Sequence, residues 1–175
     1  MHPHVAAAVG LLLALAWADL SAQQSACTLL TPDDIETITG AQPREPHKTD
    51  LVIPEGPQKG QTVNACMWGT AGNGMVSVSM MPMPEGVSRE AGMAKMEEVY
   101  AQLRAQQWTE EKQTFPDGRC SIMAPPPGKT NAPIMSGCIV EANGMVMSSV
   151  FLSPTQKLSM EQTRALMDKA VGHMD

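Results

Sequence analysis

The residues of this sequence that could do chemistry are four cysteines, a large number of methionines and a few histidines. The cysteines stand at positions 27, 66, 120 and 138. In an exported protein, an even set of this kind typically forms two disulfides. No pair has the Cys-x-x-Cys spacing of thiol–disulfide exchange, and no cysteine–histidine group has zinc-finger spacing. The pattern therefore predicts structural cross-links rather than redox or zinc chemistry.

Four cysteines allow three different pairings. We favour Cys27–Cys66 together with Cys120–Cys138, because each bond then joins neighbouring elements of the predicted structure. A disulfide typically contributes about 2–4 kcal/mol, mainly by restricting the unfolded chain. The two bonds would therefore stabilise a domain of modest size.

The methionines suggest a metal-binding alternative. Met80, Met81 and Met83 lie within four residues, and thioether sulfur is a soft ligand that selects Cu(I). In an extended chain Met81 and Met83 share one face, as do Met145 and Met147, so these faces could converge. No histidine adjoins the cluster, and methionine also fills irregular gaps in a core that has few aromatic residues. Core packing is the main interpretation, an adaptable methionine-rich binding surface is a second, and copper is the alternative cofactor.

Groups suited to catalysis are scarce. After residue 22 the histidines are His47, in a proline-rich segment, and His173, two residues before the last residue of the sequence. The sequence contains no Gly-x-Ser-x-Gly elbow and no His-Glu-x-x-His metal motif. We therefore predict no catalytic residues and no cofactor other than the copper alternative. A small secreted hydrolase is the third hypothesis.

The first residues resemble an export signal. An apolar run extends over residues 5–18, which is shorter than the roughly 20 residues that span a bilayer. We predict a signal peptide over residues 1–22, cut after Ala22, and one domain over residues 23–175; an uncut membrane anchor is the alternative. Lipid attachment at Cys27 is disfavoured, because Gln24 occupies the place of an aliphatic lipobox residue.

Composition limits the possible partners. The formal net charge is −6, and no basic cluster occurs, which argues against a nucleic-acid partner. Contact with a membrane would require an uncut signal or lipidation. The leading hypothesis is a non-enzymatic binding domain, periplasmic or secreted, for a protein, peptide or small envelope ligand. Its candidate surface comprises the segments Pro82–Gly86 and Pro125–Pro133.

The order of the predicted elements indicates an α+β fold. Residues 41–61 are rich in proline, glycine and charge, and they predict an irregular connection with a brief strand at 51–53. Helices are predicted over residues 32–39, between Thr31 and Gly40, over 88–105, and from Ser159 onward. The predicted strands cover residues 62–68, 75–81, 109–115, 119–124, 134–140 and 145–152.

The helix predicted over 88–105 has an amphipathic pattern. Its apolar stripe consists of Met96, Val99, Tyr100 and Leu103. Its charged residues are expected to face water, namely Lys95, Glu97, Glu98 and Arg104.

A short motif occurs twice. Asn73–Val76 and Asn143–Val146 both read Asn-Gly-Met-Val; a cysteine precedes each copy and a predicted helix follows each. This recurrence predicts two related hairpin–helix units that share an antiparallel sheet with the helices on one face. Chance is the alternative interpretation, because Asn-Gly is a strong signal for any hairpin turn.

Three motifs resemble a known family: the run Cys-Thr-Leu-Leu-Thr-Pro at residues 27–32, then Gly40, then Cys66-Met67-Trp68. They are similar to a family of small bacterial secreted proteins and lipoproteins with no assigned activity. The resemblance covers about residues 27–80. It implies an exported α+β domain with a bond between the first and second cysteines, and it implies no activity.

Overall fold

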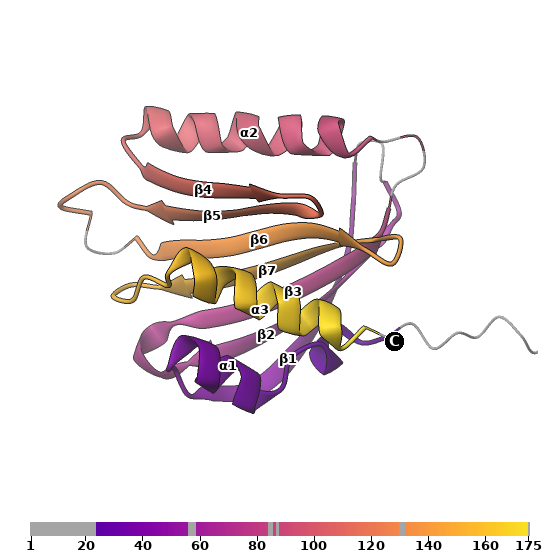
Figure 1. The fold of residues 1–175 in the computed structure, drawn as a ribbon, viewed down its shortest axis with the longest axis horizontal. Helices are drawn as coiled ribbons and strands as arrows, with labels where there is room; N and C mark the ends of the chain where they lie inside the picture. The colour runs from indigo at the N-terminus through magenta and orange to yellow at the C-terminus, as the bar shows by residue number, and fades with distance from the viewer. Residues whose placement is uncertain (1–23, 56–58, 84–85, 87, 130–131, 175) are drawn as a thin grey trace, which may run out of the picture.

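The computed structural model describes residues 24–55, 59–83, 86, 88–129 and 132–174, so the predicted signal peptide lies outside the described residues. Seven strands form one sheet in the order β1-β2-β3-β7-β6-β5-β4, and every neighbouring pair is antiparallel (Figure 1). The strands are β1 (Pro43–Val52), β2 (Thr62–Thr70), β3 (Met75–Pro82), β4 (Thr109–Phe115), β5 (Gly118–Ala124), β6 (Ile134–Ala142) and β7 (Met145–Ser153). The α-helices are α1 (Pro32–Thr39), α2 (Arg89–Ala105) and α3 (Met160–Gly172). The predicted α+β class is thus confirmed, with sheet as the larger part.

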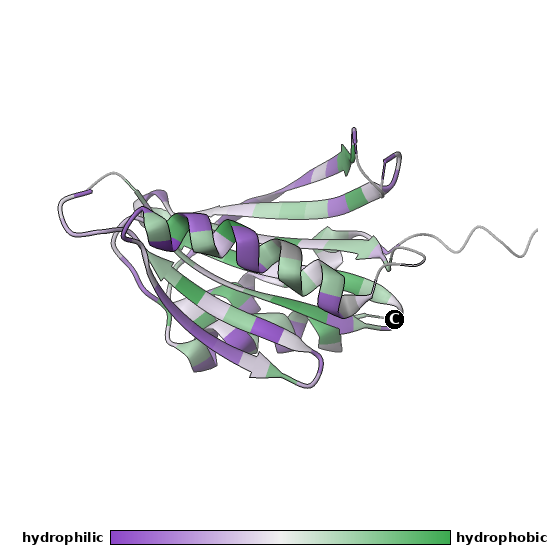
Figure 2. Ribbon diagram, turned by 90° about the horizontal axis from the view of Figure 1, so that it is seen from above, coloured by the Kyte–Doolittle hydropathy of each residue, from purple (hydrophilic) through white to green (hydrophobic). Residues whose placement is uncertain are grey.

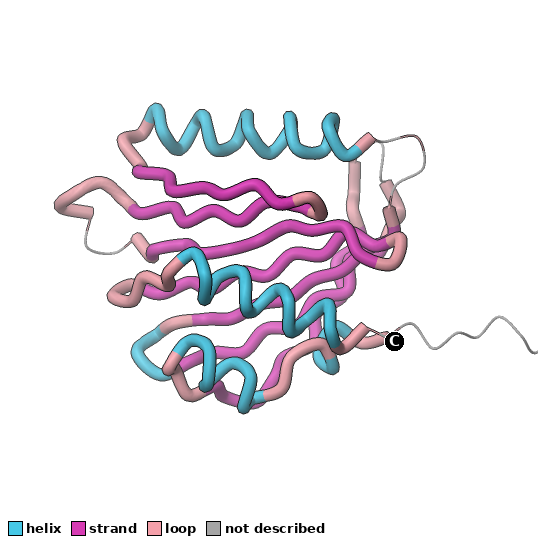
Figure 3. Tube along the Cα trace, in the orientation of Figure 1, coloured by secondary structure: helices cyan, strands magenta, loops and turns pink. Residues whose placement is uncertain are grey.

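Helices α1 and α3 lie over one face of the sheet (Figure 3). The hydrophobic core lies between that face and these two helices. Alternate residues of each central strand point into it, as expected for a sheet with one covered face. The largest fully buried side chains include Trp68, Val76, Met147, Phe151, Leu166 and Met167. This helix-covered side is called the core face below.

Local sequence explains where α1 begins and ends. The Thr31 hydroxyl accepts a hydrogen bond from the Asp34 amide, and the Asp34 carboxylate accepts one from the Thr31 amide. This reciprocal capping box satisfies two amides that the helix leaves unpaired. Gly40 ends the helix with a φ of 69°, a left-handed conformation that glycine adopts readily. The helix predicted over 32–39 is confirmed.

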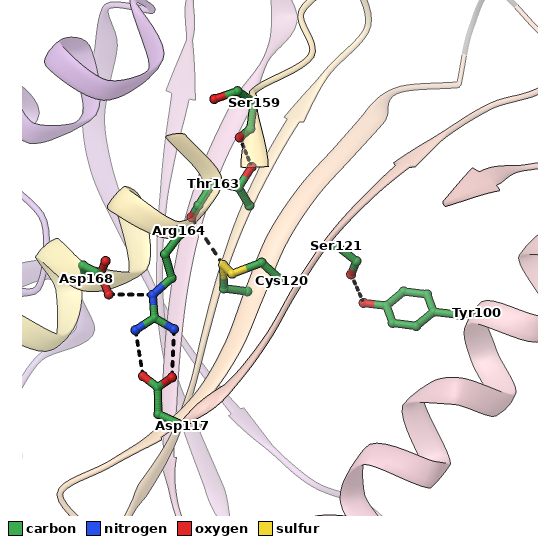
Figure 4. Close-up of a disulfide and its surroundings, with 9 residues drawn as sticks. Tyr100, Asp117, Cys120, Ser121, Ser159, Thr163, Arg164 and Asp168 are labelled. Carbon is green, nitrogen blue, oxygen red and sulfur yellow. Dashed lines mark hydrogen bonds and ion pairs between the residues drawn. A yellow bond between two sulfur atoms is a disulfide. The ribbon is translucent and has the colours of Figure 1, made fainter. Parts of the chain in front are cut away.

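An ionic contact fastens α3 to the turn between β4 and β5. Arg164 donates two hydrogen bonds to the Asp117 carboxylate, at 2.9 and 2.8 Å, and one to Asp168 at 2.7 Å (Figure 4). The same guanidinium lies 4.6 Å from the centre of the Phe115 ring. The helix is therefore held by a two-point charged contact in addition to its buried side chains.

Both favoured disulfides are present. Cys27–Cys66 links the short 3-10 helix η1 (Ala26–Thr28) to β2, and Cys120–Cys138 links register partners on β5 and β6. The sulfur of Cys138 lies 3.3 Å from the Thr163 carbonyl oxygen of α3, which places this bond on the core face. Because the Cys27 sulfur is bonded to Cys66, it is not available for a thioether to lipid.

The prediction of an irregular connection over residues 41–61 was wrong for residues 43–52. Residues 43–52 form the ten-residue strand β1, which pairs with β2 at one edge of the sheet. The register shifts between Pro43 and Pro46, where proline cannot donate to the ladder, and an edge strand tolerates this. Because most of β1 is exposed, its sequence lacks the alternation that identifies a half-buried strand.

The prediction that the helices share one face was also wrong. Ser121 and Arg119 of β5 contact α2, whereas Cys120, which lies between them, contacts the α3 side. Since neighbouring strand residues point to opposite faces, α2 lies across the sheet from α3. The physical reason is that Arg119 and Ser121 supply polar partners for α2 on that face.

The two Asn-Gly-Met-Val copies do not occupy equivalent positions. Asn143 and Gly144 form a two-residue turn with φ values of 50° and 73°. In the first copy Asn73 has a φ of 61° but Gly74 is buried, with a φ of −85°. The longer first turn shifts the strand by one residue, so Met75 points away from the core face. The structure thus does not support two related hairpin–helix units.

Candidate functional site

The methionines proposed as copper ligands lie on both sides of the sheet. Met80 is on the core face, 2% exposed, opposite its register partner Met147. Met81 points the other way by strand alternation, and Met83 follows the end of β3. Met145 shares the core face with Met147, so it does not converge with Met81. Copper binding stays a prediction, and it would require ligands other than Met80 or a rearrangement of β3.

The two predicted surface segments do not form one surface. The segment that starts at Pro82 follows β3, and the segment that starts at Pro125 follows β5. The strand pairings place these two strand ends at opposite ends of the sheet (Figure 1). Residues 84–85 and 130–131 of these segments lie outside the described residues. The exposed part of either segment is therefore a separate, smaller surface.

Helices α1 and α3 leave the other side of the sheet uncovered. We call this surface the open face and define it by the residues of β2, β3, β7 and β6 that point away from the core. All of them are partly exposed. They are Val63, Ala65, Met67, Gly69, Met75, Ser77, Ser79, Met81, Met135, Gly137, Ile139, Glu141, Val146, Ser148, Val150 and Leu152. The open face is therefore largely apolar and rich in thioethers.

Register shows how these residues are arranged across the strands. Met75, Leu152 and Met135 are successive partners, so they form an apolar row across β3, β7 and β6. Near the middle, Ser79 and Ser148 are partners whose hydroxyls lie 2.7 Å apart and hydrogen bond to each other. These strands pair on both sides, so their main-chain groups are engaged within the sheet. The open face thus offers side chains, mostly apolar, and few free hydrogen-bonding groups.

Helix α2 covers the β4–β5 end of this side of the sheet. The Ser121 hydroxyl donates to the Tyr100 hydroxyl at 3.0 Å (Figure 4). The Arg119 guanidinium lies 4.7 Å from the Tyr100 ring centre. Met96 and Leu103 are partly buried on the same stripe of α2. Val99 is instead 54% exposed, so the apolar stripe predicted for this helix was wrong at that position. Helix α2 therefore lies beside the open face, and the side of α2 that faces the sheet is partly apolar.

A group of charged residues joins α2 to the strands. Glu97 lies 2.5 Å from Arg104, 2.7 Å from Arg119 and 3.6 Å from Lys112. Glu110 of β4 pairs with both Arg104 and Arg119. The Glu110 and Arg119 side chains are only 5% and 6% exposed. We call this group the ionic cluster: Glu97, Arg104, Glu110, Lys112 and Arg119.

Hydrogen bonds within the ionic cluster shift the pKa values of Glu97 and Arg104. Hydrogen bonds from Arg119 and then Arg104 lower the pKa of Glu97 to about 2. Hydrogen bonds to Glu97 and Glu110 raise the pKa of Arg104 above its ordinary value. Glu97 and Arg104 are partly exposed, as expected, but they also pair with Arg119 and Glu110 of the strands, which was not predicted. Arg119 and Ser121, two polar residues in an otherwise apolar strand, were the signal in the sequence that could have revealed their partners.

The other side of the open face is flanked by the ends of β1 and β2. These ends bend out of the sheet on the side that carries α2, away from α1 and α3 (Figures 1 and 2). Leu51 and Val52 at this end are 57% and 62% exposed, and they are large hydrophobic residues. Leu51 is the register partner of Val63, so it extends the apolar surface of the open face.

The histidines among the described residues, His47 and His173, do not form a catalytic group. His47 is exposed on β1. The His173 ring nitrogen lies 3.2 Å from the Leu29 carbonyl oxygen and 3.8 Å from Asp34, near the capped start of α1. Within the described ranges, no group of three or more His, Cys, Asp or Glu side chains could hold a metal ion. In the same part of the chain, no helix is both long and apolar enough to span a bilayer.

Comparison with known proteins finds a similarity of fold but no similarity of sequence to a known family. No protein family matches this sequence, and no curated protein matches it either. Among solved structures, the extracellular domain of PknH from Mycobacterium tuberculosis is similar, with a TM-score of 0.53 and 12% sequence identity. The match covers 85% of this chain and 93% of that domain. The chain therefore shares its fold with an extracellular domain.

Proposed function

We propose that this protein is an exported, non-enzymatic binding domain that holds an apolar ligand on the open face. The observation that carries the proposal is the open face itself, a broad side of the sheet whose large side chains are apolar and only partly covered. A contiguous apolar surface of this kind usually marks a binding site. Two disulfides and the likeness to an extracellular domain support export, to the periplasm or the exterior.

The chemistry of the open face favours an alkyl chain over a peptide. A peptide that lies on a sheet face brings polar amides, and leaving them unpaired there is costly. The main-chain groups beneath are already engaged, and the Ser79 and Ser148 hydroxyls bond to each other. An acyl chain has no such groups to satisfy. Flexible methionines such as Met75 and Met135 adapt to a chain of variable shape. We therefore propose the acyl chain of an envelope lipid as the ligand.

The test is a titration of the disulfide-bonded protein, stripped of bound lipid, with a dansyl-labelled long-chain fatty acid. We expect a blue shift and rise of dansyl emission that saturates, with competition by an unlabelled lipid of the same chain length. The variant Val150→Arg places a charge in the middle of the open face and should abolish binding. No saturable binding by the unaltered protein would refute the proposal.

A matched control uses the same substitution elsewhere. Val99→Arg changes an exposed position of α2 that does not face the sheet. We expect this variant to bind the probe as the unaltered protein does. Circular dichroism and thermal unfolding of both variants establish that the fold is retained. Equal loss of binding in both variants would assign the probe to a surface other than the open face.

Copper(I) binding remains a second proposal, based on Met81 and Met83, which are partly exposed and one residue apart. A competitive titration with a Cu(I) chelator under reducing conditions tests it. Loss of binding in the double variant Met81→Leu/Met83→Leu, with retention in Met80→Leu, would support a site formed by the exposed pair. Affinity weaker than micromolar in the unaltered protein would discard it.

A further inference from the structure

We propose that α2 is a displaceable lid, closed over the β4–β5 end of the open face by the ionic cluster. The opening itself is independent of any ligand. Its consequence for ligand access rests on the proposed function. The inference follows from how differently the three helices are attached to the sheet.

Burial separates α2 from the other helices. The helix α3 has four buried residues, including Leu166 and Met167, and the shorter α1 has two, including Ile35. No described side chain of α2 is buried. Because buried apolar area is the main source of helix attachment, α2 gains the least from packing.

Polar contacts, rather than buried apolar side chains, attach α2 to the sheet. The ionic cluster joins α2 to β4 and β5, together with the hydrogen bond between Tyr100 and Ser121. On the α2 side the charged groups, Glu97 and Arg104, are 39% and 37% exposed. Water and salt therefore reach these pairs, which weakens them and makes them sensitive to ionic strength. The attachment of α2 should thus be released by salt, whereas that of α3 should not.

Opening of α2 would lengthen the open face. Met123 and Ser121 of β5 point to this side and are buried in the closed state. Met123 is the register partner of Met135, and Ser121 is the partner of Gly137. Uncovering them would continue the apolar row of the open face by one strand. A longer acyl chain could then be accommodated, so the lid would regulate which ligands fit.

Tyr100 is the only tyrosine in the sequence, which makes it a probe of the lid. Incorporation of 3-fluorotyrosine gives one ¹⁹F resonance, which reports the environment between Ser121 and Arg119. We expect a second, solvent-exposed signal to grow as the salt concentration rises from about 0.02 to about 1 M, where screening becomes strong. Hydrogen exchange of α2 amides should accelerate over the same range while α3 amides remain protected.

Two substitutions that each remove one carboxylate, one on α2 and one on β4, give the decisive comparison. Glu97→Gln should raise the open population at low salt roughly two- to fivefold, the loss expected for a partly exposed ion pair. Glu111→Gln removes the same charge from β4 on the opposite face, where Glu111 pairs with Lys157, and should change nothing at Tyr100. An unchanged Tyr100 signal in Glu97→Gln would overturn the lid. Equal loss of protection in α2 and α3 would overturn it as well, since the helices would then open as one unit.

The same samples separate this inference from the proposed function. A lid that opens in Glu97→Gln, in a protein that binds no fatty-acid probe, would refute the acyl-chain proposal and support the lid. Tighter binding of long probes by Glu97→Gln than by the unaltered protein would support both.

Discussion

The Arg119 guanidinium stacks against the Tyr100 ring, with its central carbon 4.7 Å from the ring centre, and this contact joins β5 to α2. Tyr100 also accepts a hydrogen bond from Ser121, two residues along the same strand. The Arg119 guanidinium thus packs against an aromatic ring and also forms ion pairs with two carboxylates, those of Glu97 and Glu110. One buried strand residue consequently organises the whole junction between the sheet and the helix beside the open face.

Removal of this guanidinium should destabilise the protein. Arg119→Gln leaves the buried Glu110 carboxylate with Arg104 as its remaining charged partner, and losing hydrogen bonds to a charged group costs about 1.5–3 kcal/mol. Urea unfolding followed by circular dichroism measures the change in the free energy of unfolding. The control Lys157→Gln breaks an exposed pair and should change it by less than about 1 kcal/mol. Similar losses in both variants would contradict a structural role specific to Arg119.

Acid should loosen α2 in a defined range. The pKa of Glu97 is lowered from 4.5 to about 2, so its ionised form favours the folded state. That contribution is complete above pH 4.5 and is lost as the pH falls toward 2. The groups around Glu97 are Arg104 on its own helix and Lys112, Arg119 and Glu110 on the strands. Loss of α2 amide protection should follow the Glu97 titration.

The pH experiment must distinguish the titration of Glu97 from that of other carboxyl groups. Burial opposes ionisation of Asp34, but hydrogen bonds with Thr31 and Lys169 outweigh it and lower the Asp34 pKa, so this group also titrates in acid. Asp34 caps α1 and lies on the other side of the sheet. In Glu97→Gln the protection of α2 should be low already and nearly flat from pH 4.5 to 2. A step that persists in this variant would show that another group controls α2.

Sequence reasoning succeeded where the signal is local. The capping residues Thr31 and Ser159 mark the helices α1 and α3, and alternation marks the central strands. The strand β1 was missed because it is an edge strand with both faces mostly exposed, which removes the alternating pattern. The side of the sheet on which α2 packs depends on Arg119 and Ser121, which are distant in sequence from the helix. No local pattern encodes such a contact, and this is why the ionic cluster was not predicted.

Two glycines should respond in opposite ways to alanine. A Cβ at Gly118 would lie 2.0 Å from the Ile139 carbonyl oxygen, so Gly118→Ala forces two paired strands apart. We expect a loss of more than about 3 kcal/mol, in the range of severe strain or overpacking. Gly92 lies within α2 with nothing within 4 Å of an added Cβ. Gly92→Ala should stabilise α2 by up to about 1 kcal/mol through helix propensity. Thermal unfolding and α2 hydrogen exchange measure both changes, and a neutral Gly118→Ala would contradict the close strand contact.

The disulfides should contribute unequally, because they close loops of different length. Cys27–Cys66 spans 39 residues and Cys120–Cys138 spans 18. Chain entropy then assigns about 4 kcal/mol to the first bond and about 3 kcal/mol to the second. The double variant Cys27→Ser/Cys66→Ser should therefore lose more stability than Cys120→Ser/Cys138→Ser in urea unfolding. Intact-mass measurement of each protein establishes the remaining bond and shows whether the chain begins at Gln23 without lipid. A larger loss from the second pair would mean that buried packing between Cys138 and α3, rather than loop closure, dominates its contribution.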